Sequence, residues 1–212
     1  MKYDIVLAGV GGQGVLSVSA VIASAAMEAG LQVKQSEVHG MAQRGGAVLA
    51  HLRLADASIA SDLIPRGRAS LILSMEPLES LRYLEFLAPG GSLITSINPV
   101  INIHDYPPVV DVLDQVRRLP HSVLIDSDKL AREAGSARAT NMVMVGAASR
   151  VLPLEASLLE RYIATRFASK GQKVVEQNLK AFRTGRDRVA LPPILMDAPV
   201  RRLLVDDQSE SA

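Results

Sequence analysis

The sequence has no cysteine and no tryptophan, and only 3% of its residues are aromatic. A chain without cysteine cannot form a disulfide, a thiolate nucleophile, a cysteine-ligated iron–sulfur cluster or a cysteine zinc site. The scarcity of aromatic side chains argues against a surface that stacks nucleic-acid bases. We therefore expect this chain to hold no cofactor covalently or through cysteine, and no metal. None of the common metal-ligand spacings involves the histidines, which are His39, His51, His104 and His121.

Excess charge and long apolar runs are absent as well. The formal net charge of the 212 residues is +1, so nothing attracts the chain to nucleic acid or to an acidic membrane. No apolar run is long enough to span a bilayer, and the first residues lack the pattern of a signal peptide. We expect a cytoplasmic protein. Its composition, 48% hydrophobic and 21% charged, is typical of a globular α/β domain.

The most informative stretch lies at the start of the chain. Residues 4–8 form an apolar run that predicts a buried strand, and residues 13–29 predict a helix rich in alanine and serine. Between them the spacing of Gly9, Gly11 and Gly14, with Gly12 in addition, fits the dinucleotide fingerprint G-x-G-x-x-G. Glycines allow a tight turn, and the N–H groups of a helix start can face a phosphate or carboxylate. We expect the backbone of this turn and the amide of Gln13 to contact such an anion, or else the turn to be empty.

A polar, glycine-rich segment follows a second predicted strand at 33–37. Glu37 lies where an acid that binds a ribose hydroxyl would be expected in a dinucleotide-binding domain. Arg44, with Gly45 and Gly46 beside it, is suited to grip a carboxylate or phosphate, although an ion pair with Glu37 or with a partner protein is the alternative. His39 is a possible acid or base, and a structural, hydrogen-bonded histidine is the alternative.

The rest of the chain predicts a mixed sheet covered by helices. Residues 47–54 alternate as a strand does, and residues 57–63 are predicted to pair with them as a hairpin. A helix is expected from Glu76 to the prolines and glycines at 89–91, with Glu76 and Glu79 at a solvated or partner-facing start. Asp128 and either Thr140 or Asn141 are expected to cap later helices.

These patterns predict a three-layer α/β/α domain with a Rossmann-like start and a helical C-terminal segment. One helix is expected at about 155–169 and another at about 172–183, ended by Gly185. We expect residues 1–188 to form the functional domain and residues 189–212 to be a tail that is disordered or docks elsewhere.

Taken together, the glycine turn at 9–14 and the run Glu-Val-His-Gly-Met-Ala-Gln-Arg-Gly-Gly at 37–46 carry a resemblance to a known family. The chain resembles the gamma-type subunits of 2-oxoacid:ferredoxin oxidoreductases, and more narrowly the small subunit of indolepyruvate:ferredoxin oxidoreductase. Weaker matches lie at 76–79, 140–146 and 178–185, so the resemblance extends over about residues 1–188.

The resemblance implies a role in the oxidative decarboxylation of a 2-oxoacid, here an arylpyruvate, to an acyl-coenzyme A with electrons passing to ferredoxin. It also implies a large partner subunit that carries thiamine diphosphate, magnesium and iron–sulfur clusters, which agrees with the lack of cysteine here. The chain would be inactive alone, would meet ferredoxin only indirectly, and would be present more than once in the assembly. Coenzyme A is a possible ligand. The candidate ligand or interface residues are Gly9, Gly11, Gly12, Gln13, Gly14, Glu37, Arg44, Gly45, Gly46 and Asn141.

Two other functions remain open from the residues. One is a stand-alone oxidoreductase that binds NAD(P) or a flavin dinucleotide through the glycine turn. The other is a purely structural subunit whose glycine turn is empty.

Overall fold

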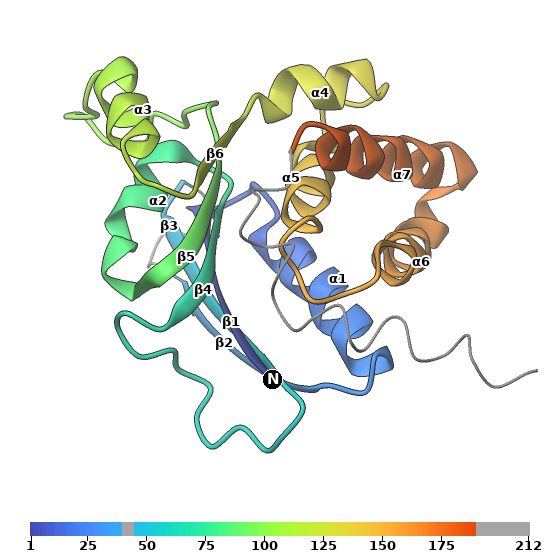
Figure 1. Cartoon of the computed structure of the whole chain (residues 1–212). Coiled ribbons are helices and arrows are strands. Elements are labelled where there is room, and N and C mark those ends of the chain that lie inside the picture. Colours follow the sequence, from blue (N-terminus) through green and yellow to red (C-terminus); the bar gives the residue numbers. More distant parts are fainter. Residues whose placement is uncertain (40–44, 190–212) are drawn as a thin grey trace, which may run out of the picture.

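The structure is a computed structural model that describes residues 1–39 and 45–189. Its centre is a six-stranded mixed sheet with the strand order β2-β3-β1-β4-β5-β6 (Figure 1). β1, β4, β5 and β6 are parallel to one another, whereas β3 runs antiparallel to both of its neighbours. The strands are β1 (Lys2–Val10), β2 (Gln32–His39), β3 (Ala47–Ala55), β4 (Ala69–Ser74), β5 (Leu87–Ser96) and β6 (Ser122–Ile125).

Helices cover both faces of this sheet, as the sequence predicts for a three-layer domain. The helices are α1 (Val15–Glu28), α2 (Pro77–Arg82), α3 (Val109–Arg117), α4 (Ser127–Glu133), α5 (Thr140–Ala148), α6 (Ala156–Phe167) and α7 (Gln172–Asp187). Figure 1 shows α2 and α3 on one face, and α1 and α5 on the other with α6 and α7 outside them. The predicted helical C-terminal segment is thus present in the described part of the chain. Within that part, no helix is both long and apolar enough to cross a membrane.

The central strands are buried on both faces, which explains their continuous apolar runs. In β1, Ile5 and Leu7 belong to the larger core beneath α1 and α5, whereas Val6 belongs to the smaller core beneath α2 and α3. The same alternation places Leu71 of β4 in the larger core and Ile72 in the smaller one. Successive side chains of a strand point to opposite faces, so each strand links the two cores.

One predicted pairing is wrong. Residues 57–63 are not a strand in the structure, and β3 pairs instead with β1 on one side and β2 on the other along its whole length. The predicted β1–helix–β2 unit is therefore split, because an antiparallel strand lies between its two strands. The segment after β3 is held as a loop by Arg53, whose Nη1 donates to the carbonyl oxygens of Ser61 (2.9 Å) and Leu63 (2.7 Å).

The guanidinium of Arg53 is itself buried and paired with Asp4 of β1. Its Nε lies 2.9 Å from Asp4 Oδ1 and its Nη2 lies 3.1 Å from Asp4 Oδ2, a two-pronged contact in which both side chains are almost fully buried. This ion pair lies at the amino end of β1 and fixes the loop over the sheet. A buried charge needs such a partner, because desolvation without one is costly.

Several helix ends also differ from the prediction. The helix expected from Glu76 to residue 88 stops at Arg82, a 3-10 turn occupies Leu84–Phe86, and β5 already begins at Leu87. The prolines and glycines at 89–91 therefore lie inside β5, where the pairing with β4 shifts its register between Ala69 and Leu71. Asp126 rather than Asp128 caps α4, because its side chain accepts the N–H of Lys129.

Gly185 lies within α7 rather than ending it, and the reason is its close packing against α5. A Cβ built on Gly185 would lie 2.0 Å from the carbonyl oxygen of Val143, and one built on Gly146 would lie 1.9 Å from that of Phe182. Such distances are possible only for glycine, so the two helices pack backbone to backbone. Their contact seats Phe182 in the larger core.

We expect Gly146→Ala and Gly185→Ala each to lower the free energy of unfolding by about 1–3 kcal/mol or more, because the added methyl group must force α5 and α7 apart. Urea unfolding followed by circular dichroism measures this. Lys180→Ala, at an exposed position of α7, is the control and should change stability little. Equal stability of all three variants would contradict the packing described here.

Candidate functional site

The carboxyl ends of β1 and β4 form the crevice where a site is expected in this kind of fold. β1 and β4 are adjacent and parallel, but the chain leaves β1 into α1 on one face and leaves β4 into α2 on the other (Figure 1). In open α/β sheets such a reversal leaves a crevice beyond the strand ends, and ligands commonly bind there. The predicted glycine turn lies at this point, directly after Val10.

Gln13 ties the glycine turn to the neighbouring strand. Its side-chain Oε1 accepts the N–H of Val10 at 2.8 Å, and its Nε2 donates to the carbonyl oxygen of Met75 at 3.0 Å. Both ends of the amide are thus used to bridge the ends of β1 and β4. Gly9 makes room for this bridge, because a Cβ there would lie 3.0 Å from Gln13 Oε1.

Gly14 is placed against Asn141, which the sequence singled out. Gly14 has a φ of 82° and occupies the N-cap position of α1, and a Cβ on it would lie 2.6 Å from Asn141 Nδ2. Asn141 is buried on α5 and does not cap that helix, since Ala139 stands at the N-cap with no side-chain bond. Its Oδ1 has no hydrogen-bond partner in the structure. Asn141 therefore supports the turn from beneath, as a packing neighbour of Gly14.

The structure places Gly45 and Gly46 against the glycine turn at residues 9–14. The N–H of Gly11 donates to the carbonyl oxygen of Gly46 at 2.8 Å, and the N–H of Gly45 donates to that of Gly11 at 3.4 Å. Asn102, from the loop after β5, donates its Nδ2 to the carbonyl oxygen of Gly45 at 2.6 Å. The N–H of Gln13 donates to the carbonyl oxygen of Val10. The N–H groups of Gly11, Gln13 and Gly45 are therefore all used in hydrogen bonds within the fold. Arg44 and the side chain of His39 lie outside the described residues.

Glu37 lies away from the glycine turn. It is on β2, which is separated from β1 by β3, so two strand spacings, about 10 Å, lie between their backbones. Its Oε1 accepts the Nε2 of Gln35. A dinucleotide-binding domain needs this acid on the strand next to the glycine turn. The inserted β3 removes that geometry, which weakens the dinucleotide alternative.

Glu76, which the sequence assigned to a solvated or partner-facing helix start, is instead buried at the centre of a hydrogen-bond network. Its Oε2 accepts the N–H of Glu79 at 2.8 Å and so caps α2, while its Oε1 accepts the hydroxyl of Tyr106 and the N–H of Val100 at 3.4 Å. Burial, reinforced by the hydrogen bond to Glu76, raises the pKa of the Tyr106 phenol above its ordinary value. Glu76 therefore anchors the loop between β5 and α3.

Glu79 is buried too, and one of its oxygens is unpaired. Its Oε1 lies 3.1 Å from the Nε of Arg82, while Oε2 has no hydrogen-bond partner. Burial raises the pKa of the Glu79 carboxyl, the charge of Arg82 lowers it, and the nearby Glu76 raises it further, with a net upward shift. The spacing of Glu76 and Glu79 indicates from the sequence that they lie one helical turn apart. It does not indicate that both side chains are buried.

A second polar cluster closes the ends of β5 and β6. Asn98 Oδ1 accepts from the hydroxyls of Ser96 (3.0 Å) and Ser127 (3.1 Å) and from the N–H of Asp128 (3.0 Å), while its Nδ2 donates to Asp126 at 3.2 Å. Sequence reasoning missed this cluster, because its members come from separate elements and form no motif.

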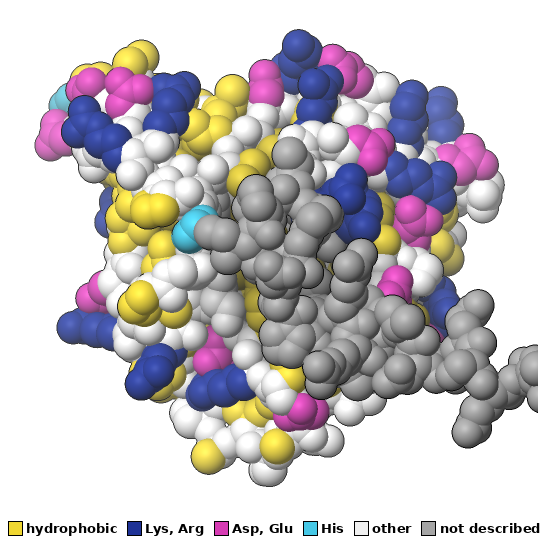
Figure 2. Space-filling view, in the orientation of Figure 1, with side chains coloured by type: hydrophobic (Ala, Val, Ile, Leu, Met, Phe, Trp, Pro, Cys, Tyr) yellow, Lys and Arg dark blue, Asp and Glu magenta, His cyan; other side chains and the backbone are white. Residues whose placement is uncertain are grey.

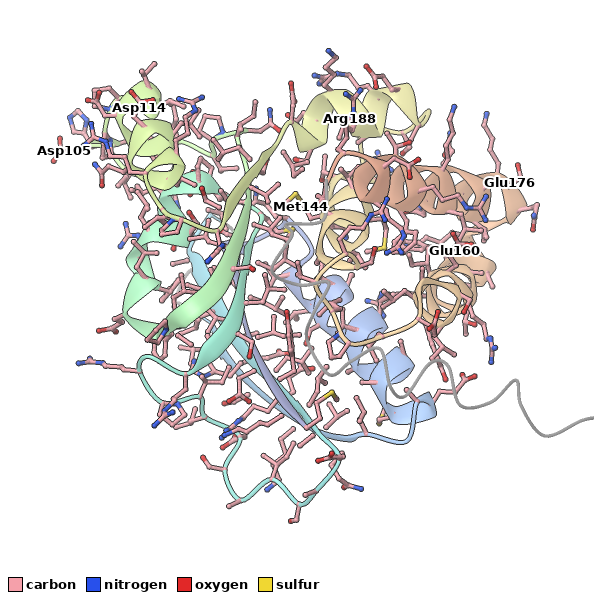
Figure 3. All side chains as sticks on the ribbon, viewed as in Figure 1. Asp105, Asp114, Met144, Glu160, Glu176 and Arg188 are labelled. Carbon is pink, nitrogen blue, oxygen red and sulfur yellow. The ribbon has the colours of Figure 1, made fainter. Side chains whose placement is uncertain are left out.

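Within the described part of the chain, a cavity and a groove lie beside the glycine turn. A cavity of about 70 Å³ lies on its inner side, lined by Gln13, Met75, Ser96, Asn98, Thr140 and Met144, among others. Figure 3 labels Met144, which lies on α5 beside the upper ends of the strands. A groove of about 240 Å³ lies on its outer side, lined by Val10, Gly11, Gly12, Gly14, Val15, Leu16 and Val48.

The chemistry available at these hollows is limited. Among the described residues, the linings offer amides, hydroxyls, aliphatic groups and the carboxyl of Asp128, but no lysine, arginine or histidine. The described residues contain no cluster of three or more His, Asp or Glu side chains able to hold a metal ion. The described part of the site therefore offers backbone, amide, hydroxyl and aliphatic groups that can shape a ligand or partner surface.

The fold and the crevice define a doubly wound α/β domain with a glycine turn at its switch point. Residues 4–188 match the pyruvate ferredoxin/flavodoxin oxidoreductase family, and the chain belongs to that family. It is 36% identical over 198 residues to indolepyruvate oxidoreductase subunit IorB of Pyrococcus horikoshii, covering 87% of this chain and 94% of the relative. It is 38% identical over 192 residues to the subunit of the same name in Archaeoglobus fulgidus, with the same coverage.

Solved structures share the fold. The gamma subunit of a keto/oxoacid ferredoxin oxidoreductase from Geobacter sulfurreducens has a TM-score of 0.66 at 24% identity, covering 88% of this chain and 97% of that one. The 2-oxoglutarate:ferredoxin oxidoreductase of Magnetococcus marinus, solved with 2-oxoglutarate, coenzyme A and succinyl-CoA bound, has a TM-score of 0.72 at 22% identity. The match covers 90% of this chain but only 32% of that longer chain.

The bridge made by Gln13 is open to a direct test. Gln13→Leu removes both polar ends of the side chain and leaves the N–H of Val10 unpaired, and we expect it to lower the free energy of unfolding by about 1–3 kcal/mol. Gln13→Glu can still accept from Val10, but it sets a carboxylate oxygen against the carbonyl oxygen of Met75, so it should lose stability as well. Denaturant unfolding measures both, with the exposed Gln172→Leu as the control. A Gln13→Leu protein as stable as the control would show that the bridge is dispensable.

The buried Glu79 predicts a pH dependence. The folded protein retains the proton of Glu79 to a higher pH than the unfolded chain, so its contribution to stability falls as the pH rises above the ordinary value of 4.5. Glu79→Gln removes this loss. We expect the stability of the variant relative to the original protein to be higher at about pH 7 than at about pH 4, in urea unfolding at both values. A difference that is the same at both pH values would contradict the upward shift.

Proposed function

We propose that the chain is the small subunit of a 2-oxoacid:ferredoxin oxidoreductase that acts on an arylpyruvate such as indolepyruvate. The proposal is supported by the two IorB relatives, since both alignments cover 94% of the relative's length. The reaction is the oxidative decarboxylation of the 2-oxoacid to an acyl-coenzyme A, with two electrons passing to ferredoxin. The enzyme works in the cytoplasm.

In this proposal the redox chemistry belongs to the large subunit. The iron–sulfur clusters are assigned to that subunit because this chain has no cysteine to ligate a cluster. Thiamine diphosphate and its magnesium ion are assigned to the same subunit. The small subunit alone does not turn over. Residues 1–188 form the unit that serves the enzyme, and the stretch 190–212 lies outside the described residues.

The observation that carries the proposal is the contact between the two glycine segments at the switch point. Gly11 and Gly46 come from separate parts of the sequence, yet they are joined by a 2.8 Å hydrogen bond beside an open groove. A Cβ on Gly12 would meet nothing within 4 Å, so it would project into open space. We infer that this exposed backbone faces either the substrate site of the large subunit or coenzyme A. Coenzyme A is one of the ligands bound in the Magnetococcus enzyme.

The enzyme class is tested by an anaerobic pull-down with the chain as bait, followed by an assay of viologen reduction that depends on both indolepyruvate and coenzyme A. We expect a cysteine-rich, thiamine-dependent partner and activity in the joint fraction. A chain that elutes alone and holds a nucleotide would instead support the dinucleotide-binding alternative.

The role of the glycine turn is tested by a matched pair of variants. Gly12 and Gly67 both have positive φ angles, 104° and 68°, and both would direct a Cβ into open space, but only Gly12 lies at the crevice. We expect Gly12→Val in the assembled enzyme to lower the rate about tenfold or more, equivalent to at least about 1.4 kcal/mol of barrier. Gly67→Val should suffer similar backbone strain with the rate within about twofold of normal. Equal rates for the two would favour a purely structural subunit.

A further inference from the structure

Three described segments at the carboxyl ends of the strands carry no charged side chain. Residues 9–16, 45–50 and 96–103 contain no Asp, Glu, Lys or Arg, although 21% of the chain is charged. The charged residues beside them are Glu76, Asp126 and Asp128, and Arg44 lies outside the described residues. A site that recognises free phosphates usually presents lysine or arginine. Absence of charge at the centre of a surface is instead typical of the core of a protein–protein interface.

The same edge presents exposed aliphatic side chains. Five large hydrophobic residues there are at least 38% exposed, and we call them the carboxyl-edge rim: Leu16, Val38, Ile101, Ile103 and Val110. Leu16 also lines the groove of the glycine turn. Ile101 and Val110, at 70% and 65%, are the most exposed of the set and flank the Pro107-Pro108 bend before α3. Figure 2 shows hydrophobic side chains at the surface on the α2–α3 side of the molecule, with charged side chains gathered around α3.

The loop that carries Ile101 and Ile103 is fastened to the site at three points. Glu76 accepts from Tyr106 and from Val100, and Asn102 donates to Gly45. The backbone is thus fixed while the aliphatic side chains remain exposed. Figure 3 shows the outer end of the loop, where Asp105 is labelled, projecting beyond α3. Several exposed aliphatic side chains at one edge of the fold, two of them on a fixed loop, suit an interaction site.

We propose that the carboxyl-edge rim is the surface on which the large, cofactor-carrying subunit docks, so that the glycine turn is enclosed between the two chains. This inference rests on the proposed function. The rim residues lie at the same edge as the crevice, and Leu16 also lines the groove, so a partner that covers the rim also covers the groove. A second copy of this chain would enclose two sites without redox groups, and a membrane surface would be expected to favour a basic rim. The large subunit is the occupant that gives the enclosed site its chemistry.

The test compares rim variants with variants at the opposite edge. Ile101→Glu and Val110→Glu place a charge in the rim, while Met27→Glu and Leu63→Glu do so at positions that are 58% and 54% exposed near the amino ends of the strands. All four side chains already face solvent, so folding should be preserved, and circular dichroism checks it. Affinity is measured by titrating each variant into the purified large subunit. We expect the rim variants to bind about tenfold or more weakly and the other two within about twofold of the original chain.

The outcomes separate the two proposals. If the original chain forms an active complex but the rim variants bind as tightly as it does, or the opposite-edge variants are the weaker ones, the docking surface is wrong and the proposed function stands. If the rim variants change only the self-association of the isolated chain, the rim is a contact between copies. If the original chain binds no thiamine-dependent subunit, both proposals fail.

Discussion

The side chain of Gln13 holds together the part of the molecule on which the rest depends. One amide spans the ends of two neighbouring parallel strands, accepting from Val10 and donating to Met75. At this place the chain turns to opposite faces of the sheet, so no helix covers the strand ends and the backbone would otherwise be open to water. With the bridge made, the glycine turn is rigid enough to carry Gly45 and Gly46 on one side and to rest on Asn141 on the other.

Around that turn the protein places binding surface rather than reactive groups. The buried carboxylate of Glu76 and the amide of Asn98 are both used to fix loops at the strand ends. The result is an edge whose loops are held by hydrogen bonds, with exposed aliphatic residues near a bare glycine backbone. Such an edge suits a subunit that completes a site on another chain. At the opposite edge, the Asp4–Arg53 pair fixes the other long loop.

The local elements could be predicted from the sequence, whereas their long-range partners could not. The apolar run before Gly9 and the alanine-rich segment after Gly14 gave β1 and α1 nearly to their ends, because propensity and glycine act within a few residues. The place of β3 depends on pairing with β1, forty residues away, and a hairpin to 57–63 satisfied the same alternation. The sequence does not indicate that Asp4 and Arg53 form a buried ion pair, because they are 49 residues apart. The role of Gly146 and Gly185 likewise depends on the contact between α5 and α7, which no local pattern predicts.

The central claim is that the carboxyl edge of the sheet is the working face of this subunit. Hydrogen–deuterium exchange of the chain, alone and within the assembled oxidoreductase, tests it most directly. We expect slower exchange on assembly for the backbone amides of residues 11–16, 45–50 and 97–110, and no change in the loop at 56–68. Protection of the 56–68 loop, with exchange at the glycine turn unaltered, would instead place the working face at the opposite edge.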